Sequence, residues 1–242
     1  MDKVMLITGA SRGIGAATAL LAAERGFAVA LNYRREQEAA QALVAQITRA
    51  GGDARAFAAD VANEEDVLRL FREVDEHFGR LDALVNNAGI LERQMRLEDM
   101  DVARLQRVFA VNVTGTFLCC REAIRRMARK HGGNGGSIVN VSSMASRLGS
   151  PNEYIDYAAA KGAVDSLTIG LAKEVAAEGI RVNAVRPGLI RTEIHASGGE
   201  PGRVERLQSA IPLGRGGEAA EVARAILFLA SDEASYSTGS FV

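Results

Sequence analysis

A tyrosine and a lysine stand four positions apart in the segment Tyr157-Ala-Ala-Ala-Lys161. On a helix this spacing places the phenol and the ammonium on one face, so both can reach one small site. A free phenol has a pKa near ~10, and acid-base work at neutral pH needs it lowered by about three units. One cation at about 4 Å favours the phenolate by roughly 4 kcal/mol at an effective dielectric of about 20. The pair therefore predicts a tyrosine that exchanges a proton with a substrate.

Ser143 supplies the other half of this predicted chemistry. A carbonyl that accepts hydride at its carbon needs a hydrogen-bond donor and a proton source at its oxygen. Ser143 can act as the donor and Tyr157 as the proton source. The adjacent Ser142 is an alternative, but alternation along a strand sends the two serine side chains to opposite sides, and we assign Ser143. The set predicts hydride transfer at a carbonyl or a secondary alcohol.

These residues need a frame, and the sequence predicts one in which strands alternate with helices. Short apolar runs predict strands over residues 4–7, 28–32, 55–59, 83–86, 138–142 and 181–186, and longer patterns predict helices over 15–25, 36–50, 64–78, 102–131, 154–178 and 218–231. Nearly continuous apolar runs are typical of parallel strands that helices cover on both faces. We therefore expect an α/β fold, a doubly wound parallel sheet with helices on both faces, as one domain over residues 1–242.

The first predicted strand ends in a glycine-rich turn, Thr8-Gly9-Ala10-Ser11-Arg12-Gly13-Ile14-Gly15. Such a turn lets the backbone approach a pyrophosphate, while the following helix N-terminus supplies amide donors. Alone it is weak evidence, because a purely structural turn can contain the same glycines. Asp60 and Val61 close the third predicted strand, where an adenine amine could be read, and Asn86-Asn87-Ala88-Gly89 closes the fourth. Together these ordered strand ends predict a dinucleotide site.

The end of the second predicted strand indicates which dinucleotide is bound. An acidic residue there favours the free 2′-hydroxyl of the adenosine ribose, whereas basic residues favour a 2′-phosphate. The chain has Arg34 and Arg35 at this place, and Arg12 in the glycine turn can converge on it. We therefore expect NADP(H), with NAD(H) as the alternative. On that alternative Arg34 and Arg35 are solvated charges that open the next helix beside Glu36 and Glu38.

Taken in order, these motifs resemble the short-chain dehydrogenase/reductase family over nearly the whole chain. The matching features are the glycine turn, the Asn-Asn-Ala-Gly segment, Asn112, Ser143, Tyr157, Lys161 and Pro187-Gly188. Within the family the chain is similar to bacterial sugar-dehydrogenase-like members and to β-ketoacyl carrier-protein reductases. The resemblance implies a Rossmann-type fold in which Tyr157 is the acid in carbonyl reduction and the base in alcohol oxidation. It further implies that Lys161 lowers the pKa of Tyr157 and holds the nicotinamide ribose. Ser143 would orient the carbonyl, and Asn112 would position a proton-relay water.

The segment after the last predicted strand carries further matches to the family. Pro187-Gly188 resembles its turn beneath the nicotinamide, with Ile190 placed to meet the carboxamide and Thr192 to bond the carboxamide or a phosphate. The alternatives are that Pro-Gly is a common turn and that Thr192 caps a local helix. Residues 188–203 lack a regular pattern and follow a strand end, where doubly wound sheets bind ligands. We expect this segment to be a flexible lid over the substrate.

The sequence departs from the resembled family in two places. The spacing from Ser143 to Tyr157 is one residue longer than in the carrier-protein reductases, and residues 147–153 are polar for a site that binds a long acyl chain. Both features favour a polar substrate. The chain also ends Ser240-Phe241-Val242, without the aspartate-glycine-glycine of the family's last strand. This ending leaves truncation open, and a missing tail would affect the subunit interface or the pocket wall rather than the catalytic residues.

Composition and cysteine usage exclude several classes of function. With 29 basic and 30 acidic residues the formal charge is -1, so no global field favours nucleic acid or a membrane surface. We expect a small-molecule carbonyl or alcohol as substrate. The adjacent Cys119 and Cys120 suit a reducing cytoplasm. No apolar run indicates a signal peptide or a membrane span, so we expect a cytoplasmic protein.

The histidines are not predicted to take part in the chemistry. His77, His131 and His195 share no metal-ligand spacing with one another or with the cysteines, so we expect no metal. His195 lies in the predicted lid, and we interpret it as an exposed loop residue rather than a substrate contact. Tyr154 precedes Tyr157 by three positions and faces the same side of the helix, where it could line the pocket.

The leading hypothesis is an NADP(H)-dependent carbonyl reductase or alcohol dehydrogenase that acts on a small polar or sugar-like substrate. The alternative enzyme reduces a β-ketoacyl thioester on a carrier protein. Such a partner could dock on the basic run Arg121, Arg125, Arg126, Arg129 and Lys130, although a solvated helix face is the simpler interpretation. A dinucleotide-binding regulator is a third hypothesis, but a sensor does not need an intact proton-transfer set.

The expected assembly is a homotetramer, with a dimer as the alternative. The helix predicted over 154–178 contains many alanines and glycines, which permit close helix approach. In the resembled family this helix and the one before it form a dimer interface, and a second interface gives tetramers.

Overall fold

A six-stranded parallel sheet forms the centre of the protein in the computed structural model, which describes residues 3–242. The strands are β1 (Lys3–Ile7), β2 (Phe27–Tyr33), β3 (Ala54–Ala58), β4 (Ala83–Asn86), β5 (Gly136–Val141) and β6 (Ile180–Val185), in the order β3-β2-β1-β4-β5-β6. β1 pairs with both β2 and β4, so the strand order reverses there. In doubly wound sheets ligands bind at this switch point, beyond the carboxyl ends of the strands. The predicted fold is confirmed.

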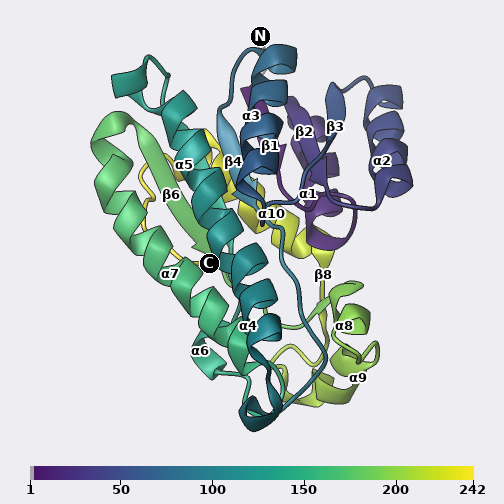
Figure 1. The fold of residues 1–242 in the computed structure, drawn as a ribbon. Helices are drawn as coiled ribbons and strands as arrows, with labels where there is room; N and C mark the ends of the chain where they lie inside the picture. Colours follow the sequence, from purple (N-terminus) through teal and green to yellow (C-terminus); the bar gives the residue numbers. More distant parts are fainter. Residues whose placement is uncertain (1–2) are drawn as a thin grey trace.

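Helices cover both faces of the sheet (Figure 1). One face packs against α1 (Gly13–Glu24), α2 (Gln37–Arg49) and α10 (Ala219–Ala230), and the other against α3 (Glu64–Phe78), α5 (Gly115–Met127) and α7 (Ile155–Val175). Alternation along β1 sends Met5 and Ile7 to the first core and Val4 and Leu6 to the second. This two-sided burial explains why the predicted strands read as continuous apolar runs.

The prediction of one continuous helix over residues 102–131 is wrong, because the structure divides this range into separate helical elements. α4 (Val102–Phe109) passes through a π-helical turn (Ala110–Thr114) into α5, and a 3-10 turn follows at Arg129–His131. Gly115 allows the close approach at this turn, since a Cβ there would lie 2.9 Å from Val61 O. π-turns inside helices are frequent at functional sites. The turn brings Asn112 toward the loop after β4.

The segment predicted as an irregular lid contains short regular elements. β7 (Ile190–Arg191) pairs in parallel with β8 (Gly217–Glu218), and α8 (Ile194–Ser197) and α9 (Arg203–Leu207) follow β7. They lie together beyond the end of the sheet, at the lower right of Figure 1. The remaining short elements are α6 (Ala145–Leu148) and the 3-10 turns Leu97–Asp99, Ala176–Glu178, Gln208–Ala210 and Asp232–Ala234. The flexibility of residues 188–203 stays a prediction.

The last residues run beside β6. Ala184 N donates to Ser240 O at 2.9 Å and Arg186 N donates to Val242 O at 2.7 Å. The Arg186 guanidinium lies 3.7 Å from the centre of the Phe241 ring, a cation–π contact that fixes this end against the sheet.

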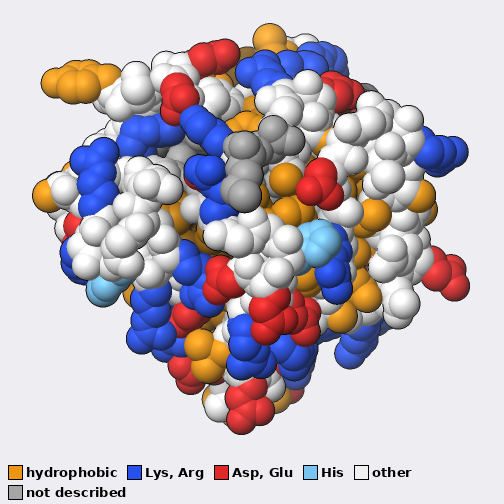
Figure 2. Space-filling view, turned by 90° about the horizontal axis from the view of Figure 1, so that it is seen from above, with side chains coloured by type: hydrophobic (Ala, Val, Ile, Leu, Met, Phe, Trp, Pro, Cys, Tyr) orange, Lys and Arg blue, Asp and Glu red, His pale blue; other side chains and the backbone are white. Residues whose placement is uncertain are grey.

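The surface carries charges of both signs, as the nearly equal numbers of basic and acidic residues predict. On the face seen in Figure 2 basic and acidic side chains are interspersed, in line with a formal charge of -1. Within residues 3–242 the helices are all too short or too polar to cross a bilayer. The same part of the chain contains no cluster of histidine, cysteine and acidic side chains that could hold a metal ion. Cys119 and Cys120 are buried free thiols.

A buried ion pair joins α4 to α7 next to the predicted catalytic tyrosine. Arg104 Nε donates to Asp156 Oδ2 at 2.7 Å, and the side chains are only 5% and 1% exposed. Asp156 Oδ1 also accepts a hydrogen bond from the backbone N of Tyr157 at 2.9 Å. The pair thus fixes the first turn of α7, from which Tyr157 projects.

Candidate active site

A cavity of about 800 Å³ opens at the carboxyl ends of the sheet strands. A volume of this size suits a small molecule or a cofactor. The predicted site residues that line it are Gly9, Ser11, Arg12, Gly13, Ile14, Arg34, Asp60, Val61, Asn87, Ala88, Gly89, Ser143, Tyr157, Lys161, Pro187, Gly188, Ile190 and Thr192. Gly15 and Asn112 do not line it. The fold therefore brings most of the predicted set to one place, although their roles stay predictions.

The glycine turn after β1 is locked to the loop after β4. The Thr8 hydroxyl accepts hydrogen bonds from the backbone N of Asn87 and of Ala88, both at 3.0 Å. Gly9 has a positive φ of 62°, and a Cβ there would lie 2.9 Å from Ala88 Cα. Glycine is the residue that satisfies both conditions at Gly9. The result is a bare backbone cradle at the helix N-terminus of α1, which suits a pyrophosphate.

Gly15 packs against the loop after β4. A Cβ on this residue would lie 2.6 Å from both Asn87 Nδ2 and Gly9 O. Asn87 Nδ2 donates to Gly9 O and Thr8 O at 2.9 Å each, so the space is already used by this network. The missing side chain of Gly15 thus lets α1 pack closely against the β4 loop, and a contact of Gly15 with the cofactor stays a prediction.

Three arginines line the end of the cavity next to β2 and β3, where the sequence predicts the adenosine. Arg12, Arg34 and Arg35 all lie there and are exposed. Arg34 Nη1 lies 3.4 Å from Asp60 Oδ2, so part of its charge is balanced. Asn32 is the next-to-last residue of β2, and its side-chain amide accepts a hydrogen bond from Gly9 N at 3.2 Å and donates one to Ala59 O at 3.0 Å. The nearest acidic residue after β2 that lines the cavity is Glu36, which follows the two arginines.

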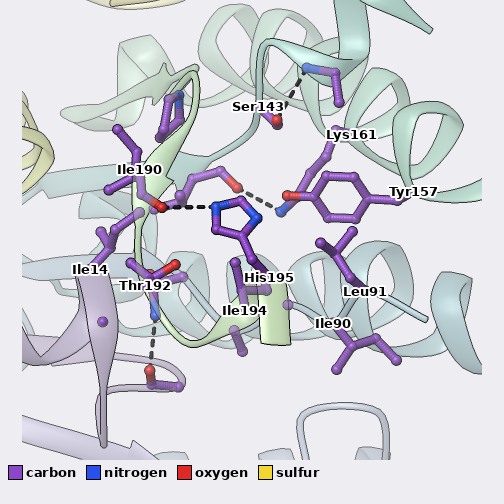
Figure 3. A pocket seen from close by; sticks show the side chains of 18 of the residues that line it. Ile14, Ile90, Leu91, Ser143, Tyr157, Lys161, Ile190, Thr192, Ile194 and His195 are labelled. Carbon is purple, nitrogen blue, oxygen red and sulfur yellow. Dashed lines mark hydrogen bonds between the residues drawn. The ribbon is translucent and has the colours of Figure 1, made fainter. Parts of the chain in front are cut away.

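Ser143, Tyr157 and Lys161 line the same cavity, and Figure 3 shows the Tyr157 hydroxyl and the Lys161 ammonium turned toward one another. The neighbouring Ser142 points away and donates to Asp165 Oδ1 at 2.6 Å, as strand alternation predicts. Ser143 Oγ faces the cavity and accepts a hydrogen bond from Ala145 N at 3.1 Å. Lys161 Nζ lies 5.5 Å from the centre of the Tyr157 ring. The arrangement presents two hydroxyls and an ammonium to one small volume.

The electrostatics of this group differ from the sequence expectation. Burial raises the pKa of Tyr157 to about 12, with the Ser143 hydroxyl acting in the opposite direction. Burial also lowers the pKa of Lys161 to about 8, while the Asp165 carboxylate opposes this change. Lys161 Nζ donates to Val141 O at 2.7 Å, which holds the ammonium at the end of β5. The phenol is therefore held in its protonated form at neutral pH, ready to donate.

Asn112 lies behind the cavity wall rather than in it. Its side chain is fully buried and its amide is used by neighbouring backbone, accepting from Ile90 N at 3.1 Å and donating to Val108 O at 2.9 Å. Nδ2 also lies 3.1 Å from Ile90 O, a second contact to that residue. The side chain therefore holds the β4 loop against the π-turn. A role in positioning a proton-relay water stays a prediction.

His195 is the residue that sequence analysis placed wrongly. It is only 8% exposed and lines the cavity from α8, and its Nε2 lies 2.9 Å from Ile190 O. The segment is further fixed by Tyr154, also a cavity residue, whose hydroxyl donates to Gly198 O at 3.2 Å. The burial of His195 depends on how α8 folds back over β7, and no local pattern in the sequence shows it.

Comparisons with known proteins place the chain among oxidoreductases. A family model described as enoyl-(acyl carrier protein) reductase matches residues 9–242. An Escherichia coli protein described as an uncharacterized oxidoreductase is 61% identical over 99% of this chain and 97% of its own length. A 3-oxoacyl-(acyl-carrier-protein) reductase of Synechocystis is 43% identical over 98% of this chain and 93% of its own length.

Solved structures agree with these sequence relatives. A short-chain type dehydrogenase/reductase from Mycobacterium marinum superposes with a TM-score of 0.93 at 38% identity, covering 99% of this chain and 92% of the other. A 3-ketoacyl-(acyl-carrier-protein) reductase from Brucella melitensis, complexed with NADH, gives 0.91 at 34% identity, over 99% and 95% of the two chains. This chain therefore belongs to the short-chain dehydrogenase/reductase family, the NAD(P)-dependent dehydrogenases and reductases that its motifs resemble.

Proposed function

We propose that the protein is an NADP(H)-dependent oxidoreductase that interconverts a carbonyl and a secondary alcohol on a small polar or sugar-like substrate. The observation that carries the proposal is the meeting of Ser143, Tyr157 and Lys161 in one cavity with the nucleotide turns. The backbone cradle at Gly9, which a Cβ would fill, fits a dinucleotide pyrophosphate. When bound, the nicotinamide supplies or accepts the hydride.

The residues of the chain provide the proton and the alignment. In the direction of reduction, Ser143 donates a hydrogen bond to the substrate carbonyl oxygen, and Tyr157 donates its phenolic proton to the same oxygen. The buried ammonium of Lys161, beside the Tyr157 ring, stabilises the phenolate that this transfer leaves. In alcohol oxidation Tyr157 takes the proton back. Pro187, Gly188, Ile190 and Thr192 line the cavity near this group and are proposed to hold the nicotinamide.

A substrate panel tests this function directly. Purified protein with NADPH is offered ketoses, diketones and β-ketoesters, and NADPH oxidation is followed by its absorbance. We expect turnover of the small polar ketones. Tight NADPH binding without turnover of any member of the panel would instead favour the dinucleotide-binding regulator.

The preference for NADP(H) is proposed from the arginines at the adenosine end. Arg12, Arg34 and Arg35 line the cavity there, and a guanidinium is well suited to bind a phosphate. The Brucella relative was solved with NADH, so the choice of cofactor within this group of relatives needs a measurement on this chain.

Neutralising Arg34 should reveal the 2′-phosphate contact. We expect Arg34→Gln to lower kcat/KM for NADPH by about 10- to 100-fold, because a hydrogen bond to a charged group contributes about 1.5–3 kcal/mol. The value for NADH should change by less than about threefold, since NADH has a hydroxyl at that position. Arg49→Gln, an exposed arginine at the end of α2, is the control. Equal losses with both cofactors, or a wild-type preference for NADH, would refute the preference.

A carrier-protein β-ketoacyl reductase remains the second candidate because relatives with that description share 40% and 43% identity with this chain. The basic run proposed as a docking surface is largely paired within the chain. Arg121 and Arg125 pair with Glu122, Arg126 with Asp75, and Lys130 with Glu178. Paired charges attract an acidic partner weakly, which supports the small polar substrate over the carrier-bound one.

We propose a homotetramer as the assembly and one domain with a mobile lid at 188–203 as the organisation. Exposed apolar side chains support an interface on the outer surface of α4, α5 and α7: Val102 (68% exposed), Phe109 (38%), Phe117 (49%) and Ile169 (43%). Light scattering at micromolar concentration should give about four times the chain mass of 25.7 kDa. A monomeric mass would be incompatible with an interface on these helices.

A further inference from the structure

Two buried polar atoms at the substrate end of the cavity lack hydrogen-bond partners. Within residues 3–242, four buried side-chain nitrogen or oxygen atoms have no partner, and two of them are His195 Nδ1 and Arg203 Nη1. Both residues line the cavity that holds Tyr157. Buried polar groups are normally paired, and leaving one unpaired costs about 1–3 kcal/mol. Their position therefore points to a polar group of a ligand.

The hydrogen bond between His195 Nε2 and Ile190 O shows which nitrogen of the His195 ring is protonated. A carbonyl oxygen can only accept a hydrogen bond, so Nε2, at 2.9 Å from Ile190 O, must carry the proton. Burial lowers the pKa of His195, and this effect outweighs the opposite effect of the hydrogen bond to Ile190 O. The ring is thus neutral near pH 7, and Nδ1 is a bare acceptor. Figure 3 shows this edge of the ring turned toward Tyr157.

Arg203 provides a donor whose positive charge is balanced by neighbouring carboxylates. Its guanidinium pairs through Nη2 with Glu153 and lies 4.8 Å from the centre of the Tyr154 ring, which holds its plane. Nη1 lies 3.6 Å from Glu200 Oε2, too far for a hydrogen bond. Because two carboxylates already balance the guanidinium, an anionic substrate gains little attraction here. A neutral oxygen suits Nη1 better.

We propose that His195 is a specificity-determining residue whose Nδ1 accepts a hydrogen bond from a hydroxyl group on the substrate, next to the carbon that exchanges hydride. Arg203 Nη1 donates to an oxygen of the same hydroxylated substrate. The substrate class is therefore the neutral hydroxy-carbonyl compounds and their polyol products. This inference rests on the proposed oxidoreductase function and narrows its substrate. A carbonyl compound without a nearby hydroxyl would leave Nδ1 unpaired and react less well.

Hydroxyacetone and acetone differ by the hydroxyl in question, and their reduction with NADPH provides the test. The measured quantity is the ratio of kcat/KM for hydroxyacetone to that for acetone, compared between variants so that intrinsic reactivity cancels. We expect His195→Gln to lower this ratio at least about tenfold, because the glutamine amide reaches the Nε2 position and leaves the Nδ1 position without an acceptor. His195→Asn places an amide oxygen near the Nδ1 position and should keep most of the ratio.

The controls separate a specificity role from a structural one. His131→Gln, at an exposed histidine, should leave the ratio unchanged. Thermal melting and NADPH fluorescence show that the His195 variants fold and bind cofactor, and acetone reduction serves as the internal reference. An unchanged ratio in a folded His195→Gln variant, or an equal loss in His195→Gln and His195→Asn, overturns the inference while the proposed function stands. Absence of any ketone reduction by the wild-type protein overturns the proposed function, and this inference with it.

Discussion

Replacing Tyr157 with phenylalanine should lower kcat for carbonyl reduction by about 10²- to 10⁴-fold, the usual contribution of a positioned general acid. The phenylalanine ring keeps the packing of α7 and removes only the hydroxyl that faces Ser143 and Lys161 in the cavity. NADPH binding, followed by nicotinamide fluorescence, should stay within about twofold of the wild-type value because the substitution leaves the backbone cradle at Gly9 and the Lys161 ammonium in place. Loss of kcat with intact cofactor binding would assign the hydroxyl to the chemical step.

Tyr154→Phe is the matched comparison for this variant. Tyr154 is one turn earlier, lines the same cavity, and uses its hydroxyl to donate to Gly198 O at 3.2 Å. Removing that hydroxyl loosens α8 but takes away no proton donor at the reacting oxygen, so we expect a loss of kcat below about tenfold. If Tyr157→Phe retained full turnover, or if both variants lost activity equally, the proton donor would have to be another group.

The pH dependence of reduction should report Lys161 rather than Tyr157. Burial holds the pKa of Tyr157 near 12, so this acid keeps its proton through the neutral and mildly alkaline range. The pKa of Lys161 is lowered to about 8, and its positive charge favours proton release from the phenol only below that pH. The rate of reduction should therefore fall as the pH rises through about 8. In Lys161→Met the rate should be low throughout, and the step near pH 8 should be absent.

Much of the fold is predictable from the sequence because its signals are local. Each buried parallel strand is a short apolar run, and the helix over 64–78 has matching bounds in the structure. The break between α4 and α5 depends on contacts that a sequence does not show. Asn112 reaches across to Ile90, and Gly115 packs on Val61. Both contacts join residues that are distant in the chain. The helical periodicity of residues 102–131 therefore does not predict the π-turn.

Some residues of the candidate site are predictable from local sequence patterns, whereas others are placed by contacts between distant parts of the chain. Residues at the carboxyl ends of parallel strands meet at one edge of the sheet. The sequence therefore predicts that the turns containing Gly9, Asn87 and Ser143 lie close together. A helical spacing of four residues predicts that Tyr157 and Lys161 share a face. It does not predict that the Lys161 ammonium donates a hydrogen bond to Val141 O. His195 was missed for a related reason, because its burial depends on α8 folding back onto the cavity.

Breaking the buried pair between Arg104 and Asp156 should destabilise the protein by about 3–5 kcal/mol. Arg104→Met keeps the length and apolar volume of the side chain but leaves the Asp156 carboxylate, which is 1% exposed, without its cation. Since the same carboxylate accepts from Tyr157 N, kcat should also fall as the start of α7 becomes less well fixed. Urea unfolding at neutral pH measures the loss as a lower midpoint with an unchanged slope.

The double variant Arg104→Met, Asp156→Leu distinguishes a lost cation from lost packing. Removing both charges relieves the buried carboxylate, so the double variant should recover most of the stability lost in Arg104→Met. Arg107 also lies on α4 and pairs at the surface with Glu92 of the loop after β4. Arg107→Met breaks this pair and should cost much less, because water screens it. A double variant no more stable than Arg104→Met would mean that the arginine acts through packing and through its bond to Arg93 O rather than through the charge it neutralises.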